Sequence, residues 1–216
     1  MIVDCVADLH GYCPKLEGGD LLIVAGDLTR RDTEGEHFDF SEWVDIQPYK
    51  KKIVISGNHD NHVNPLYIDS SRRCQYLCDS VTEFEGLKIW GSPWTKTFEG
   101  MNPRCKAFTV DLEEDLAETF DLIPDDVDIL ITHSPPYLVL DKTERGESVG
   151  SKALLGTLNA RIKPKLHVFG HIHECGGKRM ILRRPGYGSE NNTICVNASH
   201  VNERYDPVNP PMRIIL

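Results

Sequence analysis

The sequence predicts an α/β fold in a single domain spanning residues 1–216. Short apolar runs of strand length alternate with amphipathic runs of helix length, which favours parallel strands joined by right-handed crossovers. Most of the apolar runs end abruptly in glycine and polar residues, at the place where strands of open α/β sheets carry their chemistry. We find no internal repeat or linker, and this length suffices for one sizeable core.

In the first part of the chain, three apolar runs predict strands, at residues 1–7, 21–25 and 52–56. Gly18-Gly19-Asp20 is expected to be a turn before the second strand. Between the second and third strands, Phe40, Trp43 and Val44 recur at helical spacing, which predicts a helix over 36–46 that Pro48 ends. This order of elements predicts a parallel sheet.

The remainder of the chain is richer in β-type runs. Short strands are expected at 76–77, 81–84 and 87–90, with Glu85-Gly86 as a hairpin turn and a break at 91–94. Apolar residues at helical spacing predict two helices, over 111–120 and 149–162. Further strands are expected at 128–132, 165–169, 193–197 and 213–216, and 178–182 is a candidate partner for 193–197.

Composition and charge exclude several classes of protein. The chain has 24 basic and 33 acidic residues, a net charge of -9, which repels nucleic-acid polymers and anionic membranes. No apolar run reaches the roughly 18 residues that span a bilayer, and residues 1–7 lack the pattern of a signal peptide. The seven cysteines show no disulfide or zinc-knuckle spacing. We therefore expect a cytoplasmic protein with reduced thiols.

Potential ligands follow five of the predicted strands. They are Asp8 and His10, Asp27, Asn58 and His59, His133, and finally His171 and His173. Any one of these short motifs is an ordinary turn by itself. Because the carboxyl ends of parallel strands meet at one edge of a sheet, their recurrence in order predicts a shared metal site.

The ordered motifs Asp-x-His, Gly-Asp, Gly-Asn-His-Asp, His and Gly-His-x-His run from Asp8 to His173 and resemble those of the calcineurin-like metallophosphoesterases. Flanking stretches such as 91–94, 196–199 and 207–211 are similar to the small metallophosphoesterase-domain-containing proteins, relatives of class III cyclic-nucleotide phosphodiesterases. The resemblance implies a four-layer α/β/β/α sandwich. It also implies a site between the loop ends of two mixed sheets.

The resemblance also implies roles for single residues. Asp8, His10 and His173 would bind one metal ion, Asn58, His133 and His171 a second, and Asp27 would bridge both. Nitrogen and oxygen donors without a thiolate suit two divalent ions, Mn²⁺ as the first expectation and Fe, Zn²⁺ or Ni²⁺ as alternatives. Such a pair can hold a bridging hydroxide that attacks phosphorus. His59 would stabilise the transition state or protonate the leaving oxygen.

One position departs from the pattern. Many members carry a carboxylate that orients the catalytic histidine three residues after the bridging Asp27, and Arg30 stands there instead. Asp60 and Asp32 are candidates to orient His59. Arg30, Asp60 and His200 are candidate substrate contacts.

The remaining histidines are expected to have no part in the chemistry. We expect His37 and His62 at the surface and His167 in a structural role.

Three functions stay open. The first is a phosphodiesterase acting on small phosphodiesters or cyclic nucleotides. The second is a phosphomonoesterase or phosphoprotein phosphatase with the same metal site. The third is a nucleotide-binding regulator with low turnover. A nuclease is disfavoured because no basic stripe is visible. The segment 202–211 is expected either to cap the site or to contact a second copy in a homodimer.

Overall fold

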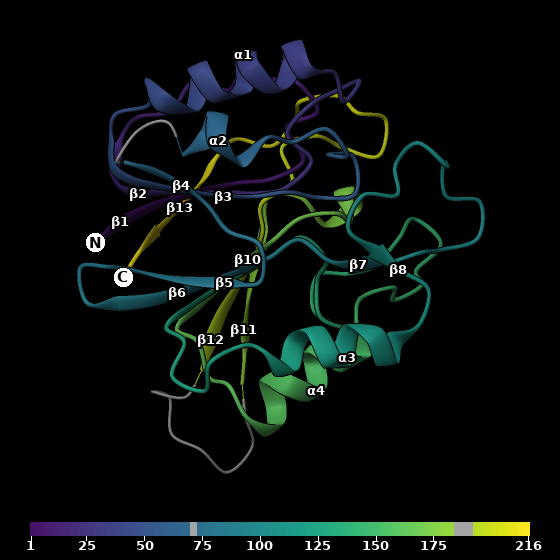
Figure 1. Ribbon diagram of the computed structural model, residues 1–216. Helices are drawn as coiled ribbons and strands as arrows, with labels where there is room; N and C mark the ends of the chain where they lie inside the picture. The colour runs from purple at the N-terminus through teal and green to yellow at the C-terminus, as the bar shows by residue number, and fades with distance from the viewer. Residues whose placement is uncertain (70–72, 184–191) are drawn as a thin grey trace.

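The predicted strands are apolar on both faces, so a sheet built from them needs cover on both sides. The computed structural model describes residues 1–69, 73–183 and 192–216, and it meets this need with four layers (Figure 1). Two sheets pack face to face. Helices α1 (Glu34–Asp45) and α2 (Pro65–Ile68) cover one outer face, and α3 (Glu113–Asp121) and α4 (Lys152–Ala160) cover the other. The predicted α/β/β/α sandwich is confirmed.

The first sheet has the order β13-β1-β2-β3-β4. Its strands are β1 (Ile2–Val6), β2 (Gly19–Ala25), β3 (Tyr49–Ile55), β4 (Cys74–Tyr76) and β13 (Met212–Ile215). β1, β2 and β3 are parallel, as predicted; β4, close to the strand expected at 76–77, joins them in parallel, and β13 runs antiparallel beside β1. Of the expected turn at 18–20 only Gly18 is outside the sheet, at φ +87°, because Gly19 and Asp20 already belong to β2.

The second sheet has the order β11-β12-β10-β9-β6-β5. Its strands are β5 (Ser80–Phe84), β6 (Leu87–Ser92), β9 (Ile129–Thr132), β10 (Leu166–Phe169), β11 (Lys178–Leu182) and β12 (Thr193–Asn197). The inner four are parallel and both edge strands are antiparallel, including the expected pair β11 and β12. Glu85 and Gly86, at φ 49° and 78°, form the predicted hairpin turn.

The expected break at 91–94 is wrong for its first half, because β6 continues through Gly91 and Ser92. Gly91 fits there because it has no side chain. A Cβ atom on it would lie 2.6 Å from Leu77 Cβ and 2.7 Å from Ile55 Cγ2. Glycine thus lets the two sheets approach closely at this point. The short strands β7 (Thr95–Lys96) and β8 (Thr109–Val110) then form a separate pair.

Alternate residues of each strand enter different cores. Ile23 and Ile131 lie in the core between the sheets, whereas Leu22 packs under α1 and Leu130 under α3 and α4. The core between the sheets fixes their spacing, and with it the distance between the loops that follow their carboxyl ends. In the described part of the chain, no helix combines the length and hydrophobicity that crossing a membrane requires.

Candidate metal centre

The predicted ligands follow β1, β2, β3, β9 and β10, and they meet where the carboxyl ends of the strands of the two packed sheets lie side by side (Figure 1). Four of these residues leave their strand in the left-handed conformation: Asp8 at φ 49°, His10 at 42°, Asp27 at 53° and His171 at 67°. Such angles are uncommon outside glycine and concentrate at functional sites. Backbone bonds from Asp8 N to Gly26 O (2.9 Å) and from His10 N to Asp27 O (3.0 Å) hold the first two loops together.

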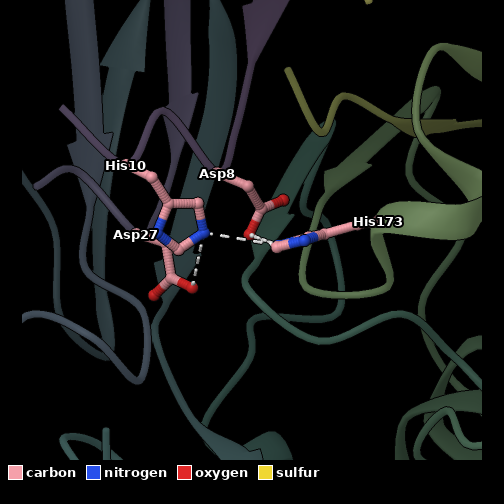
Figure 2. Close-up of side chains that lie close together, drawn as sticks. All are labelled: Asp8, His10, Asp27 and His173. Carbon is pink, nitrogen blue, oxygen red and sulfur yellow. Dashed lines mark hydrogen bonds and ion pairs between the residues drawn. The ribbon is translucent and has the colours of Figure 1, made fainter. Parts of the chain in front are cut away.

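A first group of ligands consists of Asp8, His10, Asp27 and His173. One ligand atom from each lies within 4.8 Å of the others. Figure 2 shows the two imidazoles and two carboxylates turned toward one space. His10 Nε2 lies 3.3 Å from His173 Nε2 and 3.7 Å from Asp27 Oδ2, and His173 Nε2 lies 3.5 Å from Asp8 Oδ1. This arrangement suits a cation held between them.

A second group lies on the other side of Asp27. The Asp27 Oδ1 atom lies 3.4 Å from His133 Nε2, and His133 Nε2 lies 3.1 Å from Asn58 Oδ1. The ring of His171 lies beside that of His133, with centroids 5.0 Å apart. Asp27 therefore turns one carboxylate oxygen toward each group, as a bridging ligand would.

Surrounding hydrogen bonds orient these side chains for binding. His133 Nδ1 lies 3.0 Å from the carbonyl oxygen of Ala25 and donates to it, which leaves Nε2 free for a metal ion. Asn58 Nδ2 donates to Cys105 O (3.1 Å), so its Oδ1 faces His133. Asp8 accepts from the hydroxyl of Ser199 (2.5 Å) and from the amide of His171 (2.9 Å).

The charges at the site also fit bound cations. Asp8 is fully buried and Asp27 is 1% exposed, and within the described residues their ion pairs are with histidines alone. Burial raises the pKa of Asp8, but the hydrogen bond and charge of His173 outweigh it and lower that pKa to about 2. Burial lowers the pKa of His133, but the charge of Asp27 raises it to about 10. Buried carboxylates need positive partners, which divalent ions would supply. The donors present therefore fit two such ions.

Two glycines allow the ligands to pack this closely. A Cβ atom on Gly57 would lie 2.3 Å from Asp27 Oδ1 and 2.6 Å from His133 Cε1. A Cβ atom on Gly170 would lie 2.2 Å from Asp8 Oδ2. Any larger residue would push the ligands apart. The glycines of the Gly-Asn-His-Asp and Gly-His-x-His motifs are thus steric requirements of the site.

His59 lies beside both groups of ligands without belonging to either. Its side chain is 20% exposed, and its Nε2 is 3.9 Å from Asp27 Oδ2. Its backbone amide donates to Asp27 Oδ1 (2.9 Å), and its ring stands edge-on to that of His10 with centroids 4.7 Å apart. It is therefore placed to act on a substrate held at the ligands.

Asp60 lies in a position that does not suit the expected substrate contact. It is fully buried, and its two carboxylate oxygens accept hydrogen bonds from the amides of Leu28 (3.0 Å) and Gly57 (2.8 Å). Burial and the charge of Asp27 raise its pKa well above the usual range. Asp60 ties the loop after β3 to the loop after β2, and both of its carboxylate oxygens are used in these two hydrogen bonds.

Asp32 stabilises the segment that follows His59 rather than its ring. Its carboxylate lies 2.8 Å from His37 Nε2 and 2.9 Å from His62 Nδ1, and it accepts from Asn61 Nδ2 at 2.9 Å. The expectation for His37 was wrong, because its side chain lies on the buried face of α1, in contact with Asp32, and is 3% exposed. His62 is at the surface and His167 is fully buried, as expected.

The other two candidate contacts differ in their position. Arg30 is exposed and lines a cavity of about 450 Å³ beside His59. His200 lines neither this cavity nor the larger one described below. Its Nδ1 lies 2.7 Å from Asn209 O, and this bond holds the C-terminal segment in place. We therefore correct His200 from a substrate contact to a structural residue.

Tyr205 was not anticipated from the sequence. Its ring covers the ligands, with centroids 4.7 Å from His10, 5.3 Å from His173 and 6.4 Å from His59. It lines both the smaller cavity and a larger one of about 710 Å³ that opens onto Asp27 and His171. The segment 202–211 thus caps the site. No sequence signal marks Tyr205, whereas Ser199, also missed, follows a predicted strand.

Comparisons with known proteins agree with this geometry. A family model described as Calcineurin-like phosphoesterase matches residues 3–175. The chain is 36% identical to "Metallophosphoesterase domain-containing protein 1" of Homo sapiens over 98% of this chain and 70% of that protein. It is 32% identical to a UPF0046 protein of Caenorhabditis elegans over 94% of this chain and 78% of that protein.

A solved crystal structure, 14% identical in sequence, superposes with a TM-score of 0.55 over 91% of this chain and 89% of the other. At this identity the likeness supports the fold. Together with the match over most of the sequence and the ligands gathered at the seam of the two sheets, it leads to one conclusion: the chain belongs to the calcineurin-like phosphoesterase family.

Proposed function

We propose that this phosphoesterase hydrolyses phosphodiester bonds in small molecules, with nucleotides and cyclic nucleotides as the main class. The observation that carries the proposal is the larger cavity. Its volume of about 710 Å³ is that of a small-molecule site, and it reaches Asp27, Asn58, His59, His171 and His173. Tyr205 covers part of the opening, which disfavours a protein loop or a polymer as substrate.

Two aromatic side chains support a nucleotide. Phe98 is 58% exposed and Tyr205 is 46% exposed, although both line the larger cavity. The ring of Phe98 lies 6.5 Å from that of His171, centroid to centroid. Exposed aromatic faces beside a phosphate site offer a stacking surface for a nucleobase.

The charge of the larger cavity argues against nucleic-acid polymers. Six glutamates line it, against two cations, Lys96 and Arg145; the glutamates are Glu99, Glu113, Glu144, Glu147, Glu174 and Glu203. The net charge of -9 also repels a polyanion. A short substrate with one phosphate at the ligands avoids this repulsion.

The mechanism follows from the position of each group. Asp8, His10 and His173, together with Asn58, His133 and His171, would hold two divalent cations on either side of Asp27, with Mn²⁺ as our first choice. Bound there, the cations supply Lewis acidity and an activated water for attack on phosphorus.

The remaining steps belong to the chain itself. His59, partly exposed at the boundary of both cavities, gives its proton to the leaving oxygen. The Asp27 carboxylate fixes the backbone at His59. Tyr205 limits the access of bulk water to the reacting phosphate.

The test is steady-state hydrolysis of bis(p-nitrophenyl) phosphate beside p-nitrophenyl phosphate, with added Mn²⁺, by wild type, His171→Ala and His59→Asn. We expect diester cleavage that His171→Ala abolishes. His59→Asn should lower kcat by less than the roughly 10²–10⁴-fold typical of a general acid, because p-nitrophenolate leaves without needing a proton. Preference for the monoester would replace the proposal with a phosphatase. Tight Mn²⁺ binding without cleavage of either ester would replace it with a binding role.

A further inference from the structure

We propose that the smaller cavity beside His59 is an anion subsite, and that Arg30 binds a second phosphate of the substrate there. The inference rests on the proposed function and narrows it. The preferred substrate becomes a phosphodiester that carries another phosphoryl group close to the scissile one, as a nucleoside 3′,5′-bisphosphate derivative does.

The location of the cavity is the first reason. Its volume is about 450 Å³, enough for a phosphate and part of the group that carries it. Its lining includes His10, His59 and Tyr205, and the last two also line the larger cavity. The two cavities thus meet at the proposed general acid. A substrate whose scissile phosphate lies at the ligands can extend past His59 into the smaller cavity.

Charge distinguishes the two cavities. The smaller one is lined by Arg30 and Arg204 and by one carboxylate, Asp206. The larger one is lined by Asp27 and six glutamates against two cations. In a chain with a net charge of -9, an excess of guanidinium groups beside the chemistry is unusual. An anionic extension of the substrate is drawn to the smaller cavity and repelled from the larger one.

Arg30 is free to bind an anion. Two other arginines are already engaged: Arg213 lies 2.8 Å from Asp4 and 2.9 Å from Glu17, and Arg161 lies 2.7 Å from Asp125. The side chain of Arg30 makes no hydrogen bond or ion pair with any described residue. Arg204 is less available, because its Nε lies 3.5 Å from Glu203 and its side chain is 80% exposed.

The backbone around Arg30 fixes where its guanidinium can reach. Gly11 stands at φ +83° beside it, and a Cβ atom on Gly11 would lie 3.2 Å from Arg30 Cβ. The amide of Gly11 donates to Leu28 O (3.2 Å), which ties the loop after β1 to the loop that carries Arg30. The base of the side chain is therefore held against the ligand loop. Its planar, permanently charged end can form two parallel hydrogen bonds with a phosphate.

The experiment compares two substrates that differ by one phosphate. These are thymidine 5′-(p-nitrophenyl phosphate) and the same compound with a 3′-phosphate, each assayed with Mn²⁺. We expect wild type to prefer the 3′-phosphorylated compound by about tenfold in kcat/KM, chiefly through KM, as one charge-assisted interaction provides. Arg30→Ala should bring the ratio of the two kcat/KM values close to one, and Arg30→Lys should keep part of the preference.

Arg179→Ala is the matched control, because Arg179 is an exposed arginine on β11 that lines neither cavity. It should leave the ratio as in wild type. A ratio near one in wild type would overturn the subsite while leaving the phosphodiesterase intact. So would a preference that Arg30→Ala retains, or one that Arg179→Ala removes equally.

Binding gives a second readout that does not depend on turnover. By titration calorimetry, adenosine 3′,5′-bisphosphate should bind wild type about tenfold more tightly than adenosine 5′-monophosphate, and Arg30→Ala should remove the difference. If wild type hydrolyses no ester yet shows this difference, the proposed function fails and the subsite stands. Equal binding of the two nucleotides by wild type would refute the subsite.

Discussion

The two sheets contribute different donors to the candidate metal centre. We call the loops that follow the carboxyl ends of each sheet's strands a wall of the site. The wall that follows the first sheet supplies both carboxylates, an amide and one imidazole, from Asp8, Asp27, Asn58 and His10. The wall that follows the second sheet supplies only imidazoles, from His133, His171 and His173. Neither wall alone has the charge or the number of donors that two cations need. The site exists only where the sandwich brings the walls together.

The walls also stabilise one another. His133, on the second sheet, is oriented by the carbonyl of Ala25 at the end of β2. Asp8, on the first sheet, is held by Ser199 and by the amide of His171 from the other side. Ligand geometry therefore depends on the packing between sheets as much as on either loop.

Removing the carboxylate common to both groups should have the largest effect. Asp27→Ala is expected to lower diesterase kcat by at least ~10³-fold, because both cations lose a ligand at once. Metal analysis after gel filtration should show fewer bound ions per chain than in wild type. Asp39→Ala, on the exposed face of α1, is the control and should change neither value. Wild-type metal content in Asp27→Ala would refute the bridging role.

The next largest effect is expected from a side chain inserted between the two walls of the site. Gly57→Ala places a methyl group against Asp27 and His133 simultaneously, so we expect an activity loss of roughly 10²-fold, the scale of a displacement near 1 Å. Gly156→Ala, in α4, meets no atom within 4 Å and should instead add about 0.5–1 kcal/mol of stability as a better helix residue. Activity and urea unfolding measured on both variants make the comparison. Near-normal activity in Gly57→Ala would mean that the ligands need no such close approach.

Whether the core between the sheets sets the spacing of the two walls can be tested by a substitution that changes no ligand. Ile131 is fully buried between the sheets, so Ile131→Ala should cost about 2–5 kcal/mol of unfolding free energy. We also expect weaker Mn²⁺ binding, because the walls are no longer held at one distance. Ile181→Ala, at a 44% exposed position on β11, should stay within about 0.5 kcal/mol of wild type. A destabilised Ile131→Ala with unchanged Mn²⁺ affinity would separate the site from the packing of the sheets.

The smallest expected effect concerns pH and lies in the second sheet. Burial lowers the pKa of His167 from 6.5 to about 3. Between these values the unfolded chain binds a proton that the folded chain refuses, so stability falls as pH drops below 6.5, by at most about 1.4 kcal/mol per pH unit from this group. Denaturant unfolding from pH 7 to pH 5 should show a shallower decline for His167→Gln than for wild type. An identical slope in the two proteins would contradict this account.

Much of the fold could be predicted from the sequence because the signals are local. The strands carry continuous apolar runs, the three longer helices have regular apolar spacing, and Glu85-Gly86 has the residues that a tight hairpin needs. The errors were at boundaries and in short elements, because α2, β7 and β8 were not predicted. β2 begins earlier and β6 ends later than expected, since pairing with neighbouring strands extends both.

The ligand side chains could be anticipated because they stand directly after strands. The positions of the neighbouring side chains could not be predicted, because they depend on contacts between loops that are distant in sequence. Asp60 is drawn to the amides of Leu28 and Gly57, and His37 contacts Asp32 from the buried face of α1. Tyr205 reaches the site from an irregular segment, where no periodicity indicates its direction.

The left-handed backbone at Asp8, His10, Asp27 and His171 has a consequence for which metals the site can evolve to hold. Apart from glycine, aspartate, asparagine and histidine are the residues that adopt this conformation most readily, and they bring oxygen and nitrogen donors. Cysteine and methionine, the soft donors that select copper(I), do not share that tolerance. The turns therefore act as a filter on ligand chemistry. At these four positions, a softer donor would place a less tolerant residue in left-handed backbone and so cost stability as well as change the ligand.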